Sequence, residues 1–135
     1  MTEKAVGTFT VKMTPQSWSE GSSDHSLSRF MIDKQYHGDI EGTGEGQMLA
    51  AGTGSAGSSG VYVAIERVTG RLKGRKGSFI LYHTGVMNRG VPELTISVSP
   101  DSGTGELNGI SGSLTIKIDQ GNHSYEFTYS LATIQ

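Results

Sequence analysis

The sequence predicts an all-β protein built as a single eight-stranded antiparallel barrel of the up-and-down type. Apolar and polar residues alternate strictly in about eight short runs, and no stretch has a convincing helical periodicity. Glycine makes up 20 of the 135 residues, which favours many turns between short strands. Strands with no helix to cover them bury their apolar faces and lose their exposed edges when the sheet closes on itself.

The first two runs begin the predicted barrel. In AVGTFTVKM, Phe9 and Val11 share one face, and threonine and lysine occupy the other. In LSRFMIDKQY, which starts at Leu27, both faces carry apolar residues, so we expect a partner subunit or a terminal segment to cover its outer side. The polar stretch between these runs contains the one tryptophan, Trp18, which we expect to plug one end of the barrel or, less often, to stack on a ligand.

Six further runs complete the eight. In the last three, apolar residues recur two apart, which is typical of strands that bury one face. Residues 52–60 are rich in glycine and serine and are interpreted as a flexible loop. In order, the six runs are GEGQMLAAGT, VYVAIERVTGRL, GSFILYHTGVM, PELTISVS, SGSLTIKI and HSYEFTYSLA.

Length and composition set the class of protein. Residues 1–135 suffice for one domain, and no run approaches the roughly 18 apolar residues of a membrane-spanning helix. Cysteine is absent, which excludes disulfides and thiolate chemistry. A net charge of −2 gives no general attraction to nucleic acid or to a membrane. The N-terminus lacks the pattern of a signal peptide, so a cytoplasmic location is expected, with no cofactor and no metal site.

The stretch SGTGELNGISGSL packs four glycines, Gly103, Gly105, Gly109 and Gly112, into ten positions. A dinucleotide fingerprint has the spacing G-x-G-x-x-G and opens a helix. Here the third glycine comes one residue late, and the following run is a predicted strand. We therefore interpret the cluster as turns that redirect the chain at the barrel rim around Leu107 and Ile110.

The stretch RVTGRLKGRKGSF contains five basic residues. We interpret it first as the solvated tip of a β-hairpin. An anion site is the alternative, in which Arg67 or Arg71 binds a negatively charged group at the rim. If the turn centres near Gly74 and Arg75, Glu66 lies opposite His83 on one face, with Cβ atoms about 5 Å apart. We interpret the two residues first as a structural hydrogen-bonded pair. The alternatives are a pair that orients a ligand and an acid–base pair, since a buried glutamate beside an imidazole is a candidate for exchanging protons near neutral pH.

The runs GVYVAIERVTGRLKGRKGSFILYHTGVMNRG, VSPDSGTGELNGISGSLTIKI and HSYEFTYSL resemble a bacterial family classified only as a domain of unknown function. The resemblance extends from GTFTVKM to the end of the chain. It implies a small eight-stranded, lipocalin-like (calycin-like) barrel, similar in shape to allene oxide cyclase and the dirigent proteins. No catalytic motif of those proteins is matched residue by residue, so their activity is not implied.

Our main functional prediction is a barrel that binds a small, partly apolar or amphipathic molecule, with Glu66 and His83 as polar contacts. Tyr62, Phe79 and Leu81 supply the apolar wall, and Arg67 or Arg71 an anion contact at the rim. The first alternative is an isomerase or cyclase in which Glu66 or His83 transfers a proton on an unsaturated lipid or polyketide-like substrate. The second is a structural barrel without a ligand, assembled as a dimer or trimer.

Overall fold

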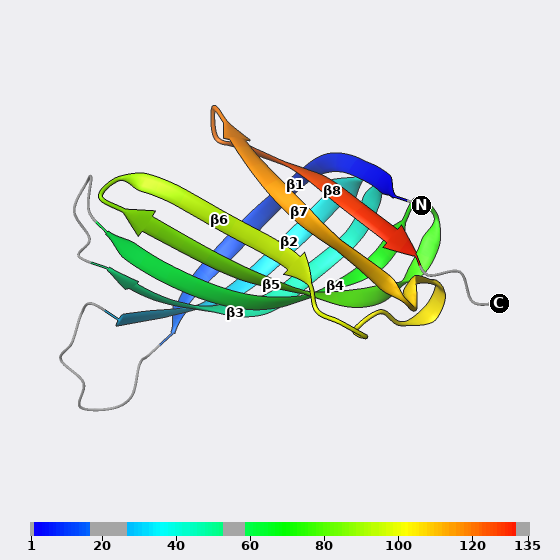
Figure 1. Cartoon of the computed structure of the whole chain (residues 1–135), viewed down its shortest axis with the longest axis horizontal. Coiled ribbons are helices and arrows are strands. Elements are labelled where there is room, and N and C mark those ends of the chain that lie inside the picture. Colours follow the sequence, from blue (N-terminus) through cyan, green and yellow to red (C-terminus); the bar gives the residue numbers. More distant parts are fainter. Residues whose placement is uncertain (1, 17–26, 53–58, 132–135) are drawn as a thin grey trace.

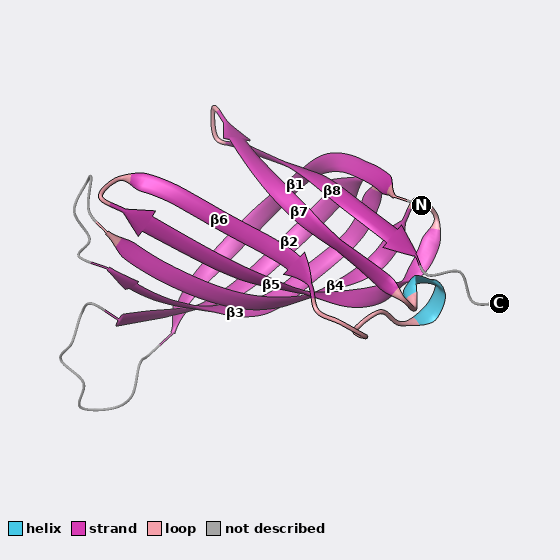
Figure 2. Cartoon of the chain, in the orientation of Figure 1, coloured by secondary structure: helices cyan, strands magenta, loops and turns pink. Residues whose placement is uncertain are grey.

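The protein is described by a computed structural model that covers residues 2–16, 27–52 and 59–131. Eight antiparallel strands close into one barrel in chain order, which confirms the predicted fold class (Figures 1 and 2). Within the described ranges, no helix is long and apolar enough to cross a membrane. The elements are β1 (Glu3–Gln16), β2 (Leu27–Gly38), β3 (Ile40–Gly52), β4 (Gly60–Leu72), β5 (Arg75–Asn88), β6 (Val91–Val98), the 3₁₀ turn η1 (Gly105–Leu107), β7 (Ile110–Asp119) and β8 (Asn122–Leu131).

The barrel closes because β1 pairs with β2 on one side and with β8 on the other. Strand pairing is extensive at every junction except between β6 and β7. Across the described residues of these two strands, Ser97 and Ser113 form the one ladder pair. By contrast, β7 pairs with β8 along its whole length, from Ile110 to Asp119. The β6–β7 seam is therefore the least hydrogen-bonded junction of the barrel.

The β4–β5 hairpin differs from the predicted register by two residues. Its turn is formed by Lys73 and Gly74, both with positive φ, as a two-residue hairpin of matching twist requires. Glu66 consequently lies opposite Leu81, and His83 lies opposite Ala64. Because side chains alternate with a period of two, this shift leaves Glu66 and His83 on the same inner face as diagonal neighbours.

Stacked aromatic side chains fill part of the barrel interior. The ring of Phe79 stacks on Phe127 with centroids 5.4 Å apart, and Phe127 stacks on Tyr129 at 5.2 Å. Phe79 and Phe127 have exposed fractions of 1% and 0%. This part of the barrel is a packed core and leaves no room for a ligand among these three rings.

The glycine-rich stretch after β6 plugs one end of the barrel, which confirms its structural interpretation. Leu107, in η1, is 1% exposed and packs into the core together with Ile110. The Thr104 amide donates to the Ser78 carbonyl, and a side chain at Gly103 would collide with the Leu107 carbonyl. Figure 2 shows η1 at the end where the N-terminus lies. We call this the plugged end.

The two apolar faces predicted for the second strand are present in β2. Ile32 and Tyr36 point inward and are buried, whereas Leu27 and Met31 point outward and are 37% and 38% exposed. The cover predicted for this outer side stays a prediction. Trp18 lies outside the described residues, as does most of the loop expected at 52–60.

Candidate functional site

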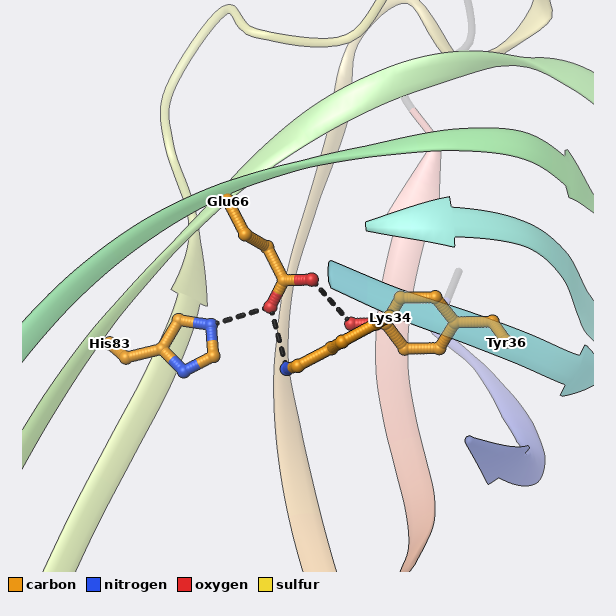
Figure 3. A network of polar contacts seen from close by, with 4 residues as sticks. All are labelled: Lys34, Tyr36, Glu66 and His83. Carbon is orange, nitrogen blue, oxygen red and sulfur yellow. Dashed lines mark hydrogen bonds and ion pairs between the residues drawn. The ribbon is translucent and has the colours of Figure 1, made fainter. Parts of the chain in front are cut away.

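A polar cluster occupies the middle of the barrel and centres on Glu66 of β4, whose side chain is 0% exposed. Glu66 Oε1 accepts hydrogen bonds from Lys34 Nζ at 2.9 Å and from His83 Nε2 at 2.8 Å. Glu66 Oε2 accepts one from the Tyr36 hydroxyl at 2.7 Å. Figure 3 shows the carboxylate between His83 on one side and Lys34 and Tyr36 on the other. We call these four residues the Glu66 network.

Lys34 is the member of the network that sequence reasoning missed. It lies on β2 between Ile32 and Tyr36, at the inward-facing parity, and is 6% exposed. Its ammonium also lies 4.9 Å from the Phe9 ring centroid, within range of a cation–π contact. The signal that could have found it was a lysine in phase with the buried apolar residues of its strand.

Glycines on β3 make room for this network. A Cβ at Gly44 would collide with Glu66 Oε2 and would lie 2.9 Å from Tyr36 Cε2. A Cβ at Gly46 would collide with the Ile65 carbonyl and lie 2.9 Å from Glu66 Cβ. The G-x-G spacing in GTGEG therefore places two positions without side chains on the inner face, one against the Glu66 carboxylate and one against Glu66 Cα and Cβ.

The network keeps Glu66 ionised. Burial alone raises the pKa of this carboxyl. The hydrogen bond from His83, the positive charge and hydrogen bond of Lys34, and the hydrogen bond from Tyr36 all lower it, and the pKa falls to about 2. Burial and the adjacent Glu66 charge raise the Tyr36 pKa well above its ordinary value, so this phenol stays a donor.

This result corrects the expectation that Glu66 exchanges protons near neutral pH. Three donors outweigh the effect of burial, so Glu66 is a fixed negative charge that balances Lys34. Of the two residues named for proton transfer in the isomerase alternative, Glu66 is unsuited to it, and the role of His83 stays a prediction. Glu66 instead positions its neighbours.

A hollow of about 320 Å³ lies beyond the network, toward the end of the barrel opposite the plug. The half-buried side chain of Tyr62 forms one wall of this hollow. The Tyr62 ring lies over Gly85, where an added Cβ would collide with the ring. Tyr62 and Gly85 lie opposite each other, two residues along their strands from Ala64 and His83, so the lining begins one inward-facing step beyond the level of His83. We call it the Tyr62 hollow; its lining residues are Met48, Ala50, Gly60, Val61, Tyr62, Gly85, Val86, Met87, Pro92, Glu93 and Leu94.

The structure separates the other predicted site residues. Phe79 and Leu81 are 1% and 0% exposed and belong to the packed core. Arg67 and Arg71 are exposed and alternate with the buried residues of β4, so they project from the outer face. Neither arginine can reach the interior, because its side chain points to the opposite face of β4 from the side chain of Glu66.

Among the described residues, no three histidine, aspartate or glutamate side chains gather in a way that could hold a metal ion. The Glu66 network contains one carboxylate and one imidazole, and both are engaged with each other and with Lys34. Its chemistry is that of a charge-balanced polar layer inside an apolar barrel.

Fold and site thus define a class, a small closed β-barrel with a buried, ionised polar layer. Residues 5–129 match the family described as protein of unknown function (DUF3224), and the chain belongs to this family. This confirms the family resemblance predicted from the sequence.

A solved structure from Shewanella oneidensis MR-1, described as a protein with unknown function from the DUF3224 family, is 40% identical to this chain. The similarity covers 98% of this chain and 100% of that one, with a TM-score of 0.89. No curated protein matches the chain.

Replacing Glu66 by Gln leaves the Lys34 ammonium buried without its counter-charge. We expect a loss of about 3–5 kcal/mol in the free energy of unfolding, measured by urea denaturation. Glu45→Gln is the matched control: Glu45 is exposed on the neighbouring strand, and its loss should change stability by less than about 0.5 kcal/mol. Equal stabilities for the two variants would contradict the role assigned to Glu66.

The stability of the protein should also depend on pH through Glu66. Its pKa falls from the ordinary 4.5 to about 2 on folding, so the ionised form favours the folded state. This contribution, on the order of 3 kcal/mol, is complete above about pH 5.5 and disappears as the pH falls toward about 2. The stability difference between wild type and Glu66→Gln, measured by denaturation at a series of pH values, should shrink across this interval. A difference that stays constant down to the lowest pH would refute the assignment.

Proposed function

We propose that the barrel binds a small, largely apolar molecule in the Tyr62 hollow. The observation that supports this most directly is a hollow of about 320 Å³ on the inner face, next to a buried polar layer. Ligand sites are mostly apolar concavities of roughly 300–1,000 Å³ with a few placed polar groups, and this hollow lies at the lower end of that range. A molecule of two or three aromatic rings would fit.

The lining supports an apolar occupant with little charge. Met48, Met87 and Leu94 line the hollow, and methionine side chains adapt readily to differently shaped ligands. Burial raises the pKa of Tyr62, so its phenol stays protonated and can donate a hydrogen bond. The basic side chains predicted for the rim lie on the outer face, so the proposal has no anion contact.

Glu66 has an indirect part in this proposal. Both of its oxygens are occupied by internal donors, and its side chain is fully buried. It therefore holds His83 and Lys34 in place below the ligand. The similarity in shape to allene oxide cyclase and the dirigent proteins stays a prediction, and ligand binding does not depend on it.

Filling the hollow should weaken binding. We expect the neutral fluorescent probe N-phenyl-1-naphthylamine to bind the wild-type protein saturably, and Leu94→Trp to weaken binding at least about tenfold by occupying the space. Thr128→Trp adds the same bulk at an exposed position of β8 and should leave the affinity unchanged. Absence of saturable binding to the wild type, or equal binding by both variants, would contradict the proposal.

We also propose that the barrel pairs with a second copy of itself through an outer apolar face on β3, β4 and β5. Leu49 lies opposite Val63, and Ile65 opposite Tyr82, so four apolar side chains form one contiguous patch. They are 44%, 46%, 63% and 42% exposed, and such patches on small proteins commonly mark contacts with other chains. The outward Met31 of β2 extends this face.

Light scattering coupled to size-exclusion chromatography tests the pairing. The wild type should elute as a dimer at micromolar concentration, and Ile65→Asp should shift it to the monomer by placing a charge in the contact. Ile118→Asp is the control, since Ile118 is 65% exposed on β7, away from the patch. A wild-type protein that is monomeric throughout would overturn this part of the proposal.

A further inference from the structure

The wall of the barrel is incomplete on one side of the end opposite the plug. β1 runs to Gln16, but its ladder with β8 ends at Phe9, and the described residues of β6 and β7 meet at the single pair Ser97–Ser113. The β7–β8 hairpin therefore does not cover this end, and Figure 1 shows the tip of the hairpin standing apart from β6. In the described part of the chain, the interior is bounded here by β1 to β6 alone, as a trough that is open on one side.

Inward-facing apolar side chains become exposed where the wall is missing. Phe9, which lies beside β8, is 4% exposed. Met13 lies on the same face of β1, opposite the inward-facing Ile32, and is 43% exposed. Leu94 of β6 also points inward, in phase with the buried Ile96, and is 44% exposed. The described residues therefore leave space beside Met13 and Leu94 on the inner side of the sheet.

The trough continues the Tyr62 hollow across two more strands. Met48 of β3 lines the hollow, and Phe30 of β2 lies directly opposite Met48 on the same face. Pro15 of β1 lies opposite Phe30, and Met13 lies one inward-facing step further along β1. Directly opposite side chains on one face of a sheet are near neighbours, and adjacent strands lie about 4.8 Å apart. β2 and β1 therefore extend the apolar surface of the hollow by about 10 Å.

This inner surface is uncharged. Beyond the Glu66 network, the inward-facing positions in the described part of β1 to β6 are apolar apart from Ser28 and the phenol of Tyr62. The nearest cation, Lys34, is already paired with Glu66 at 2.9 Å. An ionic group bound here would lose its hydration without gaining a partner, so the surface favours neutral molecules. Methionine side chains at both ends of the trough suit a flexible occupant, because they adapt to many shapes.

We propose that the ligand is an elongated, uncharged molecule with a flexible aliphatic chain, which lies partly in the Tyr62 hollow and partly along Phe30 and Met13. This inference rests on the proposed binding in the hollow and names the class of ligand. A compact molecule would fill the hollow and leave Met13 exposed, whereas a chain that reaches β1 buries this side chain. A second copy on the outer face of β3, β4 and β5 would leave the trough free, because the two surfaces lie on opposite sides of the same strands.

Two straight-chain alcohols test the inference. Hexan-1-ol and dodecan-1-ol carry the same head group on chains of different length, and each can compete with N-phenyl-1-naphthylamine for the wild-type protein. The affinity should rise about twofold to fourfold for each added methylene. Met13→Asp places a charge at the far end of the trough and should weaken binding of dodecan-1-ol at least about tenfold, but that of hexan-1-ol less than about twofold. Thr14→Asp adds the same charge on the outer face of β1 and should change neither affinity.

The outcomes separate the inference from the proposal beneath it. An equal effect of Met13→Asp on the two alcohols would overturn the extension along β1. Failure of N-phenyl-1-naphthylamine and of both alcohols to bind the wild type would contradict the proposed function itself.

¹³C NMR of the methionine methyl groups gives an independent reading on the wild type. Saturating dodecan-1-ol should shift the signals of Met13 and Met48, whereas hexan-1-ol should shift that of Met48 alone. The methyl group of Met31 points outward from β2 and should keep its position in both titrations, as an internal control. A Met13 signal that does not move with dodecan-1-ol while that of Met48 does would refute the elongated ligand and leave binding in the hollow intact.

Discussion

The rest of the structure depends on one constraint: a carboxylate with no exposed surface must stay charged inside a barrel of apolar side chains. An unpaired buried charge would cost several kcal/mol, so its environment has to supply compensation from several strands. Lys34 and Tyr36 come from β2, His83 from β5, and the space for all of them from glycines on β3. Four adjacent strands are thereby tied to one register, because a shift of one residue would turn any of these groups outward.

This constraint divides the barrel into three levels. Leu107 and the stacked aromatic rings fill the plugged end, the Glu66 network forms a polar layer above them, and the Tyr62 hollow lies beyond it. The inward-facing residues that line the hollow on β4 and β5 begin one step beyond the polar layer. The stability of the fold depends on the middle level, and the proposed ligand site lies in the level beyond it.

The alternation of residues predicted the strands and their closure, since each strand has one buried face. It also brought Glu66 and His83 together, because a two-residue error in the hairpin register preserves the face on which a side chain lies. Lys34 was missed because a lone lysine normally marks a solvated position. The parity of β4 already placed Arg67 and Arg71 on the outer side, so their assignment to the site could have been avoided. The low pKa of Glu66 could not be predicted, because it depends on a donor from a strand 32 residues away.

The most direct test of this account is the titration of Glu66 itself, followed through the ¹³C chemical shift of its side-chain carboxyl in the folded protein. The account predicts that the carboxyl remains ionised well below its ordinary pKa of 4.5 and begins to protonate only as the pH approaches about 2. A midpoint at or above 4.5 would show that burial outweighs the three donors. The account of Glu66 as a carboxylate whose ionised form is stabilised by its three donors would then be wrong.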